Sequence, residues 1–399
     1  FFRRRGTLLE SRPMKGTLPR GRWLEEDERN MALLHASAKN RAENLMIVDM
    51  VRNDLGRVAM MGSVQVPALF EVERYATVLQ MTSTVRCACA PARTTVEILA
   101  ALFPCGSVTG APKVRTMEII HELEPFARGI YTGAIGVFMP GGDGIVNVPI
   151  RTITLDTRTG EATFNVGGGI TADSTIADEY EECLTKTAFL TAPALDFGLL
   201  ESLLLEDGVY PLLARHLQRL QASARYFDMA YDAAHVRAAL DACARAHPAG
   251  AWKARLVLTP DGRANCAAER RPPLRGPWRI GFARRRVNAH DRLLYHKTTA
   301  RARYDAARRE RPDCDDVILC NERGEVTEAS IANIVIACAG RKLTPPSSAG
   351  LLPGVFRAEL LAAGVIAEAM LRPDDIRRAD GIWLINAVRG WVPAALAEE

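Results

Sequence analysis

The sequence predicts an α+β protein with two consecutive domains. Its 399 residues, at roughly 150 residues per domain, correspond to two or three domains. Hydrophobic residues make up 48% and charged residues 25% of the chain, as in ordinary globular proteins with a sizeable core. Segments with helical spacing of apolar residues are interspersed with strand–turn–strand patterns, which favours the α+β class.

The two predicted domains meet at a short linker. Residues 1–190 contain the glycine-rich segments PCGSVTGAPK and NVGGGI, whereas residues 198–399 begin with a helix-rich part and continue with short strands and helices. Pro193 lies between them and is expected to end the preceding helix. We therefore predict domains at 1–190 and 198–399, joined by a linker at 191–197.

Three helices are predicted in the first domain. Residues 37–55 carry apolar side chains at helical spacing, at Leu45, Val48, Val51 and Leu55. Residues 112–123 form a predicted helix with a proline in its first turn, where proline is tolerated. Residues 175–190 follow Ser174, a residue type that caps helix N-termini.

Strands are predicted between these helices. Residues 131–139 and 147–155 are apolar segments on either side of Gly-Gly-Asp-Gly at 141–144, which predicts a hairpin. Residues 162–165 form a further predicted strand, which leads into three consecutive glycines at 167–169.

Composition and charge exclude several classes of protein. A net charge of +4, with only short Arg clusters at 3–5 and 284–286, does not supply the sustained basic face that nucleic-acid binding requires. No apolar run reaches the length of a membrane span, and the start FFRRRG lacks the apolar segment of a signal peptide. The nine cysteines show no zinc spacing, so we expect reduced thiols in a cytoplasmic protein. Because the chain lacks an initiator Met, we expect it to begin inside a longer product.

Acidic side chains and a glycine run indicate an anion and metal site in the first domain. Glu179, Glu182 and Lys186 are three and four residues apart, so they share one helical face, which on an arbitrary helix would be a solvated, ion-paired face. Here the helix follows Gly167–Gly169, where a ligand carboxylate can approach main-chain N–H groups closely. Glu43 could supply a second carboxylate, and Mg²⁺ is usually held by one or two protein carboxylates plus substrate oxygens.

The first domain resembles the chorismate-utilising enzymes. The motifs that carry the resemblance are, in order, AENLMIVDMVRNDLGRV, LFPCGSVTGAPKVRTMEII, RGIYTGAIG, VPIRT, VGGGITADS and EYEECLTK. The family includes component I of anthranilate synthase and of aminodeoxychorismate synthase, and its core consists of layered sheets with flanking helices. The resemblance implies that Glu43 and Glu182 bind Mg²⁺, with Glu179 beside the metal. It also implies that chorismate is bound by Tyr131, Arg151, Gly167, Gly168, Gly169, Lys186, Gln80 and Thr109.

Lys15, in the segment RPMKGTLPRG, distinguishes two chemistries within this family. PMKGT resembles the Pro-Ile-Lys-Gly-Thr segment of aminodeoxychorismate synthase, whereas anthranilate synthases carry Ala in place of the Lys. The resemblance implies that the neutral amine of Lys15 adds to C2 of the chorismate ring and expels the C4 hydroxyl. Ammonia then adds at C4 and expels the lysine, which splits one displacement into two. The alternatives are a purely electrostatic role and an ordinary solvated lysine in a turn.

Two departures from the family pattern concern the same site. Gln80, in the segment QMTS, stands where the family has a His near the C4 hydroxyl. The family's general acid is a Glu in a Ser-Pro-Glu motif, which would precede Phe1, as would the family's N-terminal strands. A chain that began at Phe1 would lack both.

The second domain resembles the fold-type IV pyridoxal-phosphate enzymes, which have two subdomains. Lys297 lies in LLYHKTTARARYDAA at a predicted strand-to-helix passage, and Glu328 lies between the two predicted strands of DDVILCNERGEVTEASIANIVI. The resemblance implies that Lys297 holds the cofactor covalently and that Glu328 pairs with its pyridinium nitrogen. It places the phosphate at Arg219 and at the N–H groups of Gly354 and Val355, where a helix begins. The segment Asn-Ala-Val-Arg-Gly at 386–390, with Asn386 at its start, resembles a turn on the substrate side in this family.

Phe356 and His216 have no predicted role at the cofactor site. Phe356 stands where many relatives have a small or hydroxyl residue, so a phosphate contact from that side chain is lost. His216 is most simply a packing or surface histidine, and no role was assigned to it.

Together the two domains predict an enzyme of 4-aminobenzoate synthesis for folate. The first would aminate chorismate to aminodeoxychorismate, and the second would eliminate pyruvate from it. A glutamine amidotransferase subunit would supply the ammonia, and the second domain could form a homodimer. Two alternatives stay open at this point: an anthranilate synthase-like domain fused to an aminotransferase, and a non-catalytic fragment that binds chorismate.

Overall fold

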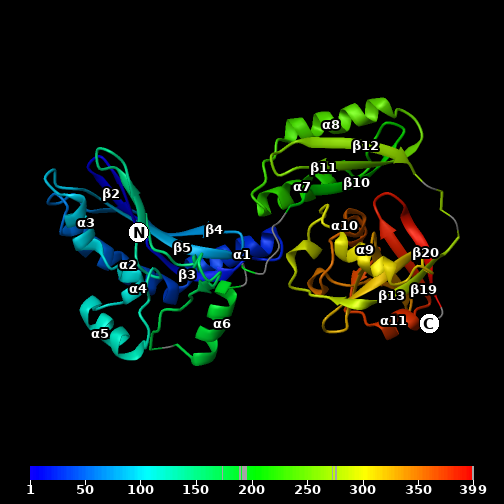
Figure 1. The fold of residues 1–399 in the computed structure, drawn as a ribbon. Helices are drawn as coiled ribbons and strands as arrows, with labels where there is room; N and C mark the ends of the chain where they lie inside the picture. The colour runs from blue at the N-terminus through cyan, green and yellow to red at the C-terminus, as the bar shows by residue number, and fades with distance from the viewer. Residues whose placement is uncertain (173, 188–189, 191–195, 272, 275, 398–399) are drawn as a thin grey trace. The chain divides into compact units, whose positions relative to one another are not determined.

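The computed structural model describes residues 1–399 except 173, 188–189, 191–195, 272, 275 and 398–399. The described residues form two compact units, residues 1–20 with 28–194 and residues 21–27 with 195–399. Both units combine strands and helices, in agreement with the predicted α+β class (Figure 1). Most of the predicted linker, residues 191–195, lies outside the described residues.

The first unit is built on a seven-stranded sheet in the order β3-β5-β2-β1-β7-β6, with β4 paired to β5. The strands are β1 (Phe2–Arg5), β2 (Leu8–Ser11), β3 (Met14–Pro19), β4 (Gln65–Arg74), β5 (Val78–Ala88), β6 (Ile135–Phe138) and β7 (Gly144–Asn147). A separate hairpin contains β8 (Ile153–Leu155) and β9 (Ala162–Phe164). The long β5 is the centre of the sheet because it pairs with β2, β3 and β4.

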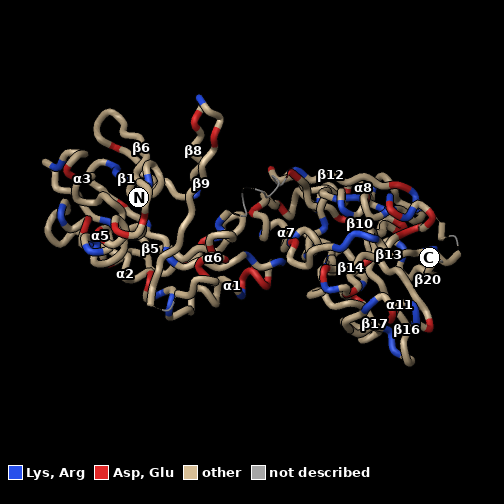
Figure 2. Tube along the Cα trace, turned by 60° about the horizontal axis from the view of Figure 1, so that its bottom comes forward, with Lys and Arg blue, Asp and Glu red and all other residues tan. Residues whose placement is uncertain are grey.

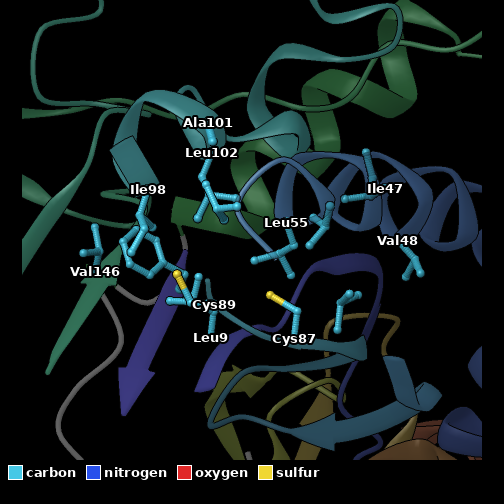
Figure 3. Packing of buried hydrophobic residues seen from close by; sticks show 14 residues of the cluster. Leu9, Ile47, Val48, Leu55, Cys87, Cys89, Ile98, Ala101, Leu102 and Val146 are labelled. Carbon is cyan, nitrogen blue, oxygen red and sulfur yellow. The ribbon is translucent and has the colours of Figure 1, made fainter. Parts of the chain in front are cut away.

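The helices that accompany this sheet are α1 (Leu24–Ala36), whose first residues belong to the second unit, α2 (Ala38–Gly56), α3 (Thr95–Leu102), α4 (Gly106–Thr109), α5 (Lys113–Leu123) and α6 (Ile176–Thr187). Of these, α2 packs on β3, β4 and β5. Figure 3 shows the core, where Leu55 of α2 and Leu102 of α3 meet Leu9 of β2 and Cys87 of β5. Val48 and Val51 are also buried, as the helical spacing predicted, but Leu45 is 44% exposed. The buried face of α2 runs through Ile47 instead, because 47, 48, 51 and 55 share one face at 3.6 residues per turn.

The structure differs from two local predictions, the strand at 147–155 and the cap of α6. The predicted strand 147–155 is divided: β7 ends at Asn147 and pairs with β6, whereas β8 begins at Ile153 and pairs with β9. Pro149 and the positive φ of Arg151 (50°) interrupt regular pairing between them. At α6, the residue that caps the helix is Thr175, whose hydroxyl accepts the Asp178 N–H at 3.2 Å, and the prediction of Ser174 was wrong by one position. Residues 188–189 of that predicted helix are outside the described residues.

The second unit starts with a small three-stranded sheet. The strands β10 (Leu199–Glu206), β11 (Ala251–Leu258) and β12 (Ala264–Arg270) pair antiparallel in that order. The helices α7 (Leu213–Tyr226) and α8 (Ala233–Ala246) pack on it. Their shared core includes Leu220 and Leu240 from the helices and Leu203 and Leu256 from the strands.

A larger, mixed sheet of eight strands completes this unit, in the order β15-β14-β13-β20-β19-β16-β17-β18. The strands are β13 (Trp278–Val287), β14 (Asp316–Asn321), β15 (Val326–Ala329), β16 (Asn333–Cys338), β17 (Arg341–Thr344), β18 (Ala367–Glu368), β19 (Gly381–Asn386) and β20 (Gly390–Leu396). The helices that accompany them are η2 (Arg292–Leu294), α9 (Ala302–Arg309), η3 (Ser347–Ala349), α10 (Val355–Ala362) and α11 (Pro373–Arg377). β13 pairs in parallel with β14 and β20, and these pairings place chain segments about 35 and 115 residues apart side by side.

Residues 21–27 also belong to the second unit. The Tyr226 hydroxyl donates to the Gly21 carbonyl oxygen at 2.5 Å, and a ring nitrogen of His296 lies 3.1 Å from the Arg22 carbonyl oxygen. The ring of Trp23 packs against that of Tyr295 with centroids 5.0 Å apart. This short segment therefore contacts the residue that directly precedes Lys297.

Charge is mixed along the chain, and Figure 2 shows Lys and Arg interspersed with Asp and Glu in both units. None of the helices in the described part of the chain is both long enough and apolar enough to cross a bilayer.

Candidate active sites

The first unit brings most of its predicted site residues to one cavity of about 580 Å³. Of the residues predicted for chorismate and Mg²⁺, those that line it are Lys15, Glu43, Gln80, Tyr131, Arg151, Gly167, Gly168, Gly169, Glu179, Glu182 and Lys186. Thr109 does not line the cavity, since its hydroxyl donates to the Cys105 carbonyl oxygen within α4. Its neighbour Val108 does, so α4 still forms part of the wall.

Lys15 is held on β3 with its amine directed at the glycine loop. Its Nζ lies 3.5 Å from Oε2 of Glu43, and its carbonyl oxygen accepts from Nδ2 of Asn44 at 3.3 Å. A Cβ added to Gly169 would collide with Nζ of Lys15, so only glycine permits this approach. Gln80, which replaces the family's His, donates from Nε2 to the Gly16 carbonyl oxygen at 2.9 Å and thereby fixes the strand beside Lys15.

The acidic side chains of α2 and α6 face the same space. Lys186 lies 2.5 Å from Oε1 of Glu182 and also donates to the Gly167 carbonyl oxygen at 2.9 Å. No cluster of three His, Cys, Asp or Glu side chains occurs within the described ranges. Two carboxylates, Glu43 and Glu182, nevertheless fit Mg²⁺, which commonly takes its remaining ligands from substrate and water.

One carboxylate oxygen of Glu179 has no hydrogen-bond partner among the described residues. Its Oε1 accepts from the Ser174 hydroxyl at 2.6 Å, but its Oε2 is buried and makes no hydrogen bond with the described residues. A Cβ on Gly168 would collide with this Oε2. A buried carboxylate oxygen without a partner is costly, and a bound cation or a substrate proton donor would satisfy it.

Strained backbone surrounds the same cavity. Thr132 and Arg151 both line it and both have positive φ, 61° and 50°, which costs about 1 kcal/mol or more for residues other than glycine. Their neighbour Tyr131 is partly buried, and this burial raises the pKa of its hydroxyl. Tyr131 and Arg151 therefore present a neutral donor and a cation, the groups expected for a carboxylate ligand.

The second unit has its own cavity, of about 170 Å³, and all six predicted cofactor residues line it or form its wall. They are Lys297, Glu328, Arg219, Gly354, Val355 and Asn386.

Lys297 lies in the passage between η2 and α9, and its backbone is tied to the small sheet. The Leu200 N–H donates to the Lys297 carbonyl oxygen at 2.9 Å. Burial, followed by the nearby charge of Arg219, lowers the pKa of Lys297 to about 8. A substantial fraction of the amine is thus neutral near pH 8, as a nucleophile requires.

Glu328 is part of β15, not of the turn between strands where the sequence placed it. Its Oε1 accepts from the Tyr304 hydroxyl at 2.8 Å, and Nδ2 of Asn333 lies 3.5 Å from its Oε2. Burial raises the pKa of Glu328 to about 7, although the bond from Tyr304 opposes this rise. A cationic ring nitrogen beside this carboxyl group would favour its ionised form, which fits a pyridinium partner.

An anion site lies at the other end of this cavity. The guanidinium of Arg219 donates to Glu201 from Nε at 2.9 Å and to the Pro353 carbonyl oxygen from Nη1 at 3.1 Å. The charge of Arg219 and hydrogen bonds from His216 and Arg219 outweigh burial and lower the pKa of Glu201 to about 2. The N-terminus of α10 at Gly354 has no side-chain cap, so its N–H groups remain available to a phosphate.

His216 is a site residue that sequence reasoning missed. It is 2% exposed, its Nδ1 lies 2.7 Å from Oε2 of Glu201, and its Nε2 is buried without a partner among the described residues. The available signal was its spacing, because His216 and Arg219 are three residues apart on α7 and share one face. Together with Arg219 and the uncapped helix, this unsatisfied nitrogen supports the fit of an anionic cofactor.

Comparison with known proteins agrees with this geometry. The family of chorismate binding enzymes matches residues 1–192, and the amino-transferase class IV family matches residues 198–397. The second match covers half of the chain, and the chain belongs to the amino-transferase class IV family; residues 1–192 are similar to the chorismate binding enzymes. Chorismate-binding enzymes use Mg²⁺ and fold-type IV class IV enzymes use pyridoxal phosphate, and the two cavities contain residues suited to these groups.

Individual relatives are similar over one half at a time. Aminodeoxychorismate synthase of Arabidopsis thaliana is 47% identical over 193 residues, which are 48% of this chain and 21% of that protein. Component 1 of the Bacillus subtilis enzyme is 46% identical over 195 residues, 49% of this chain and 41% of that protein. The chain therefore spans less than half the length of the curated relatives it matches. A crystal structure of 4-amino-4-deoxychorismate lyase from Pseudomonas aeruginosa is 24% identical with a TM-score of 0.45, covering 52% of this chain and 88% of that one.

Proposed function

We propose that this chain makes 4-aminobenzoate from chorismate in two steps, an amination in the chorismate-binding unit and an elimination of pyruvate in the class IV unit. The observation that carries the proposal is Lys15, whose amine lies 3.5 Å from Glu43 and against Gly169 in the cavity of the first unit. The names of the relatives, aminodeoxychorismate synthase, support the choice of reaction. The amine that this reaction creates is the group on which a class IV enzyme acts.

In the first step, Lys15 is the nucleophile. Arg151, Tyr131 and the N–H groups of Gly167–Gly169 would bind the two carboxylates of chorismate, and Glu43 and Glu182 would hold Mg²⁺. The Lys15 amine adds to C2 of the ring, both double bonds of the ring diene shift by one position, and the C4 hydroxyl leaves as water after it gains a proton. Ammonia then adds at C4 and the Lys15 amine leaves from C2, which restores the ring bonds.

In the second step, Lys297 is the base. Pyridoxal phosphate, when bound, supplies an electron sink for the bond that loses its proton. Arg219, the N-terminus of α10 and Glu328 would hold the phosphate and ring of the cofactor. The Lys297 amine removes the proton at C4, the C3–O bond breaks, and the ring becomes aromatic. The leaving group is enolpyruvate, which takes up one proton to give pyruvate.

Further partners follow from this chemistry. The relative from Bacillus subtilis is called component 1, which supports a second component. We propose that this component is a glutamine amidotransferase that supplies the ammonia. We also propose a homodimer formed through the class IV unit.

The experiment that tests the second step uses purified aminodeoxychorismate. The full chain, loaded with pyridoxal phosphate, is expected to release pyruvate and 4-aminobenzoate in equal amounts, and Lys297→Ala is expected to release neither. If the wild-type chain instead transferred the amine to a keto acid and left the enolpyruvyl group in place, the class IV unit would be an aminotransferase. If neither product formed, the chain would be a non-catalytic fragment.

A further inference from the structure

The cavity of the class IV unit carries an excess of positive charge. Among the residues that the structure describes, six basic side chains and one acidic side chain, Glu328, line it; the basic ones are Arg219, Lys253, Arg255, Lys297, Arg301 and Arg389. A concave site lined by one sign of charge concentrates ligands of the opposite sign. The natural occupants are therefore anions, of which the cofactor phosphate is only one.

Three of these six basic groups already have partners in the protein. Arg219 is paired with Glu201 at 2.6 Å, and Lys253 is paired with Glu269 at 2.7 Å. Arg301 donates to the Ser330 carbonyl oxygen. These three side chains are thus satisfied before any substrate binds.

Arg389 differs from them. Within the described residues, its guanidinium makes no hydrogen bond and no ion pair, and it lies 5.3 Å from the centroid of the Trp278 ring. Arg389 is only partly exposed, and burial lowers the pKa of its guanidinium. The charges of Glu269 and Asp316 oppose this effect, but neither carboxylate forms an ion pair with Arg389 among the described residues. A partly buried guanidinium without a hydrogen-bonded acceptor is costly, and a bound carboxylate would remove that cost.

The backbone of Arg389 is fixed in place. It lies in the turn between β19 and β20, where Oδ1 of Asn386 accepts the N–H groups of Val388 at 3.1 Å and of Arg389 at 2.9 Å. Stacking on Trp278 further restricts the guanidinium plane. This pre-organisation reduces the entropy lost when a planar carboxylate binds to it through two hydrogen bonds.

Arg255 is the other guanidinium of the cavity without a hydrogen bond or ion pair to a described residue. It belongs to β11 of the small sheet, whereas Arg389 belongs to the large sheet. The cavity therefore offers unpaired guanidinium groups from two sides. An amine with a single carboxylate can occupy one of them, and an amine with two carboxylates can occupy both.

We propose that Arg389 binds a carboxylate of the substrate and thereby selects amines that carry two carboxylates over those that carry one. This inference rests on the proposed function and deepens it, because the product of the first step keeps both carboxylates of chorismate. Arg389 thus becomes the residue that distinguishes the substrate of an elimination from an ordinary monocarboxylate amino acid.

The test measures binding and needs no turnover. Isophthalate, with two carboxylates, and benzoate, with one, are titrated into the full chain loaded with pyridoxal phosphate, and binding is followed by calorimetry and by the cofactor absorbance. The wild type is expected to bind isophthalate about tenfold or more tightly than benzoate, the gain typical of one charge-assisted hydrogen-bonded contact. Arg389→Ala should lose this preference, and Arg389→Lys should keep part of it.

Controls separate this role from a loss of folding. Arg245→Ala, at an exposed position of α8, should leave both affinities unchanged. Arg389→Gln is measured in parallel, so that the conclusion stands on it if Arg389→Ala fails to take up the cofactor. A preference for isophthalate that survives in Arg389→Gln overturns the proposal, and so does an equal weakening of both ligands.

Turnover measurements then separate the role of Arg389 from the proposed function of the chain. If the wild type releases pyruvate from aminodeoxychorismate and Arg389→Gln leaves KM unchanged, the role of Arg389 is wrong and the proposed function stands. If the wild type releases no pyruvate but shows the Arg389-dependent preference for isophthalate, the carboxylate site stands and the proposed function fails. The expected result is a rise in KM of about tenfold with a smaller change in kcat.

Discussion

The hydroxyl of Tyr304 donates a 2.8 Å hydrogen bond to Oε1 of Glu328, and both side chains are buried. Tyr304 lies on α9, seven residues after Lys297, and Glu328 lies on β15. The bond favours the ionised form of a carboxyl group whose pKa burial raises to about 7. Helix α9, which follows Lys297, thus supplies the tyrosine that orients Glu328, the side chain expected to face the cofactor ring.

Removal of that hydrogen bond should weaken cofactor binding. In Tyr304→Phe the pKa of Glu328 rises further, so less carboxylate is present to pair with the pyridinium nitrogen. We expect the Kd for pyridoxal phosphate to increase about tenfold, in line with the loss of a hydrogen bond to a charged group. Absorbance titration measures this, and Tyr231→Phe serves as a control because Tyr231 lies outside the cavity. Equal Kd values for the wild type and Tyr304→Phe would show that the bond has no such role.

Replacement of Lys297 should stabilise the cofactor-free protein at neutral pH. Burial lowers the pKa of Lys297 from 10.5 to about 8, so the unfolded chain binds more protons than the folded one between these values. Stability of the wild type therefore rises as the pH increases through this window, and below pH 8 the protonated lysine costs up to about 3 kcal/mol. Lys297→Met lacks this cost.

The measurement is thermal or urea unfolding of both proteins, without cofactor, from pH 6.5 to 10.5. The advantage of Lys297→Met should be largest at pH 6.5 to 7.5 and should disappear towards pH 10.5. A difference that did not change with pH would mean that it arises from packing and not from the buried charge.

An added methyl group on the glycine loop should impair only the amination. In Gly169→Ala the new Cβ would collide with Nζ of Lys15, so the nucleophile must move. We expect the amination rate to fall about a hundredfold, because small displacements of reacting groups have effects of this size. Pyruvate release from aminodeoxychorismate should be unchanged.

The matched control for this substitution is Gly56→Ala. Gly56 is the last residue of α2, and a Cβ added there would meet no other atom within 4 Å. It should leave both rates unchanged. An equal loss in both glycine variants would point to a general effect of the substitution and against contact with Lys15.

Chelation should also separate the two activities. If Glu43 and Glu182 hold the metal that contacts chorismate, as we propose, EDTA should stop amination and added Mg²⁺ should restore it. The class IV unit uses no metal in this account, so pyruvate release should continue at its original rate. Amination that persists in EDTA would remove the metal role assigned to these carboxylates.

Local features of the fold were predictable from sequence, and long-range ones were not. Helix α2 followed from apolar spacing, yet Leu45 proved exposed because the buried face runs through Ile47. The predicted N-cap of α6 was wrong by one residue, because Ser174 and Thr175 both carry a hydroxyl that can cap a helix. In the structure the Ser174 hydroxyl donates to Glu179 instead, and Thr175 caps the helix. The pairing of β7 with β1 joins residues about 140 apart, which no local pattern indicates.

The candidate sites show the same division. Family motifs identified Lys15, Glu43 and Lys297, and the structure brings each to the expected cavity. They did not identify His216, and they placed Arg389 in a substrate-side turn without a role of its own, because the roles proposed for both depend on the neighbours that the fold supplies. A histidine three residues before Arg219 has many possible environments, and only packing shows that its Nε2 is buried without a partner among the described residues.

The central claim is that Lys15 directs amination to C4 of chorismate. The most direct measurement incubates the full chain with chorismate, ammonia, Mg²⁺ and pyridoxal phosphate and separates 4-aminobenzoate from anthranilate by chromatography. We expect the wild type to form 4-aminobenzoate and Lys15→Ala to form none. Pyruvate release from added aminodeoxychorismate should continue in both proteins. Anthranilate as the product of the wild type would contradict the account.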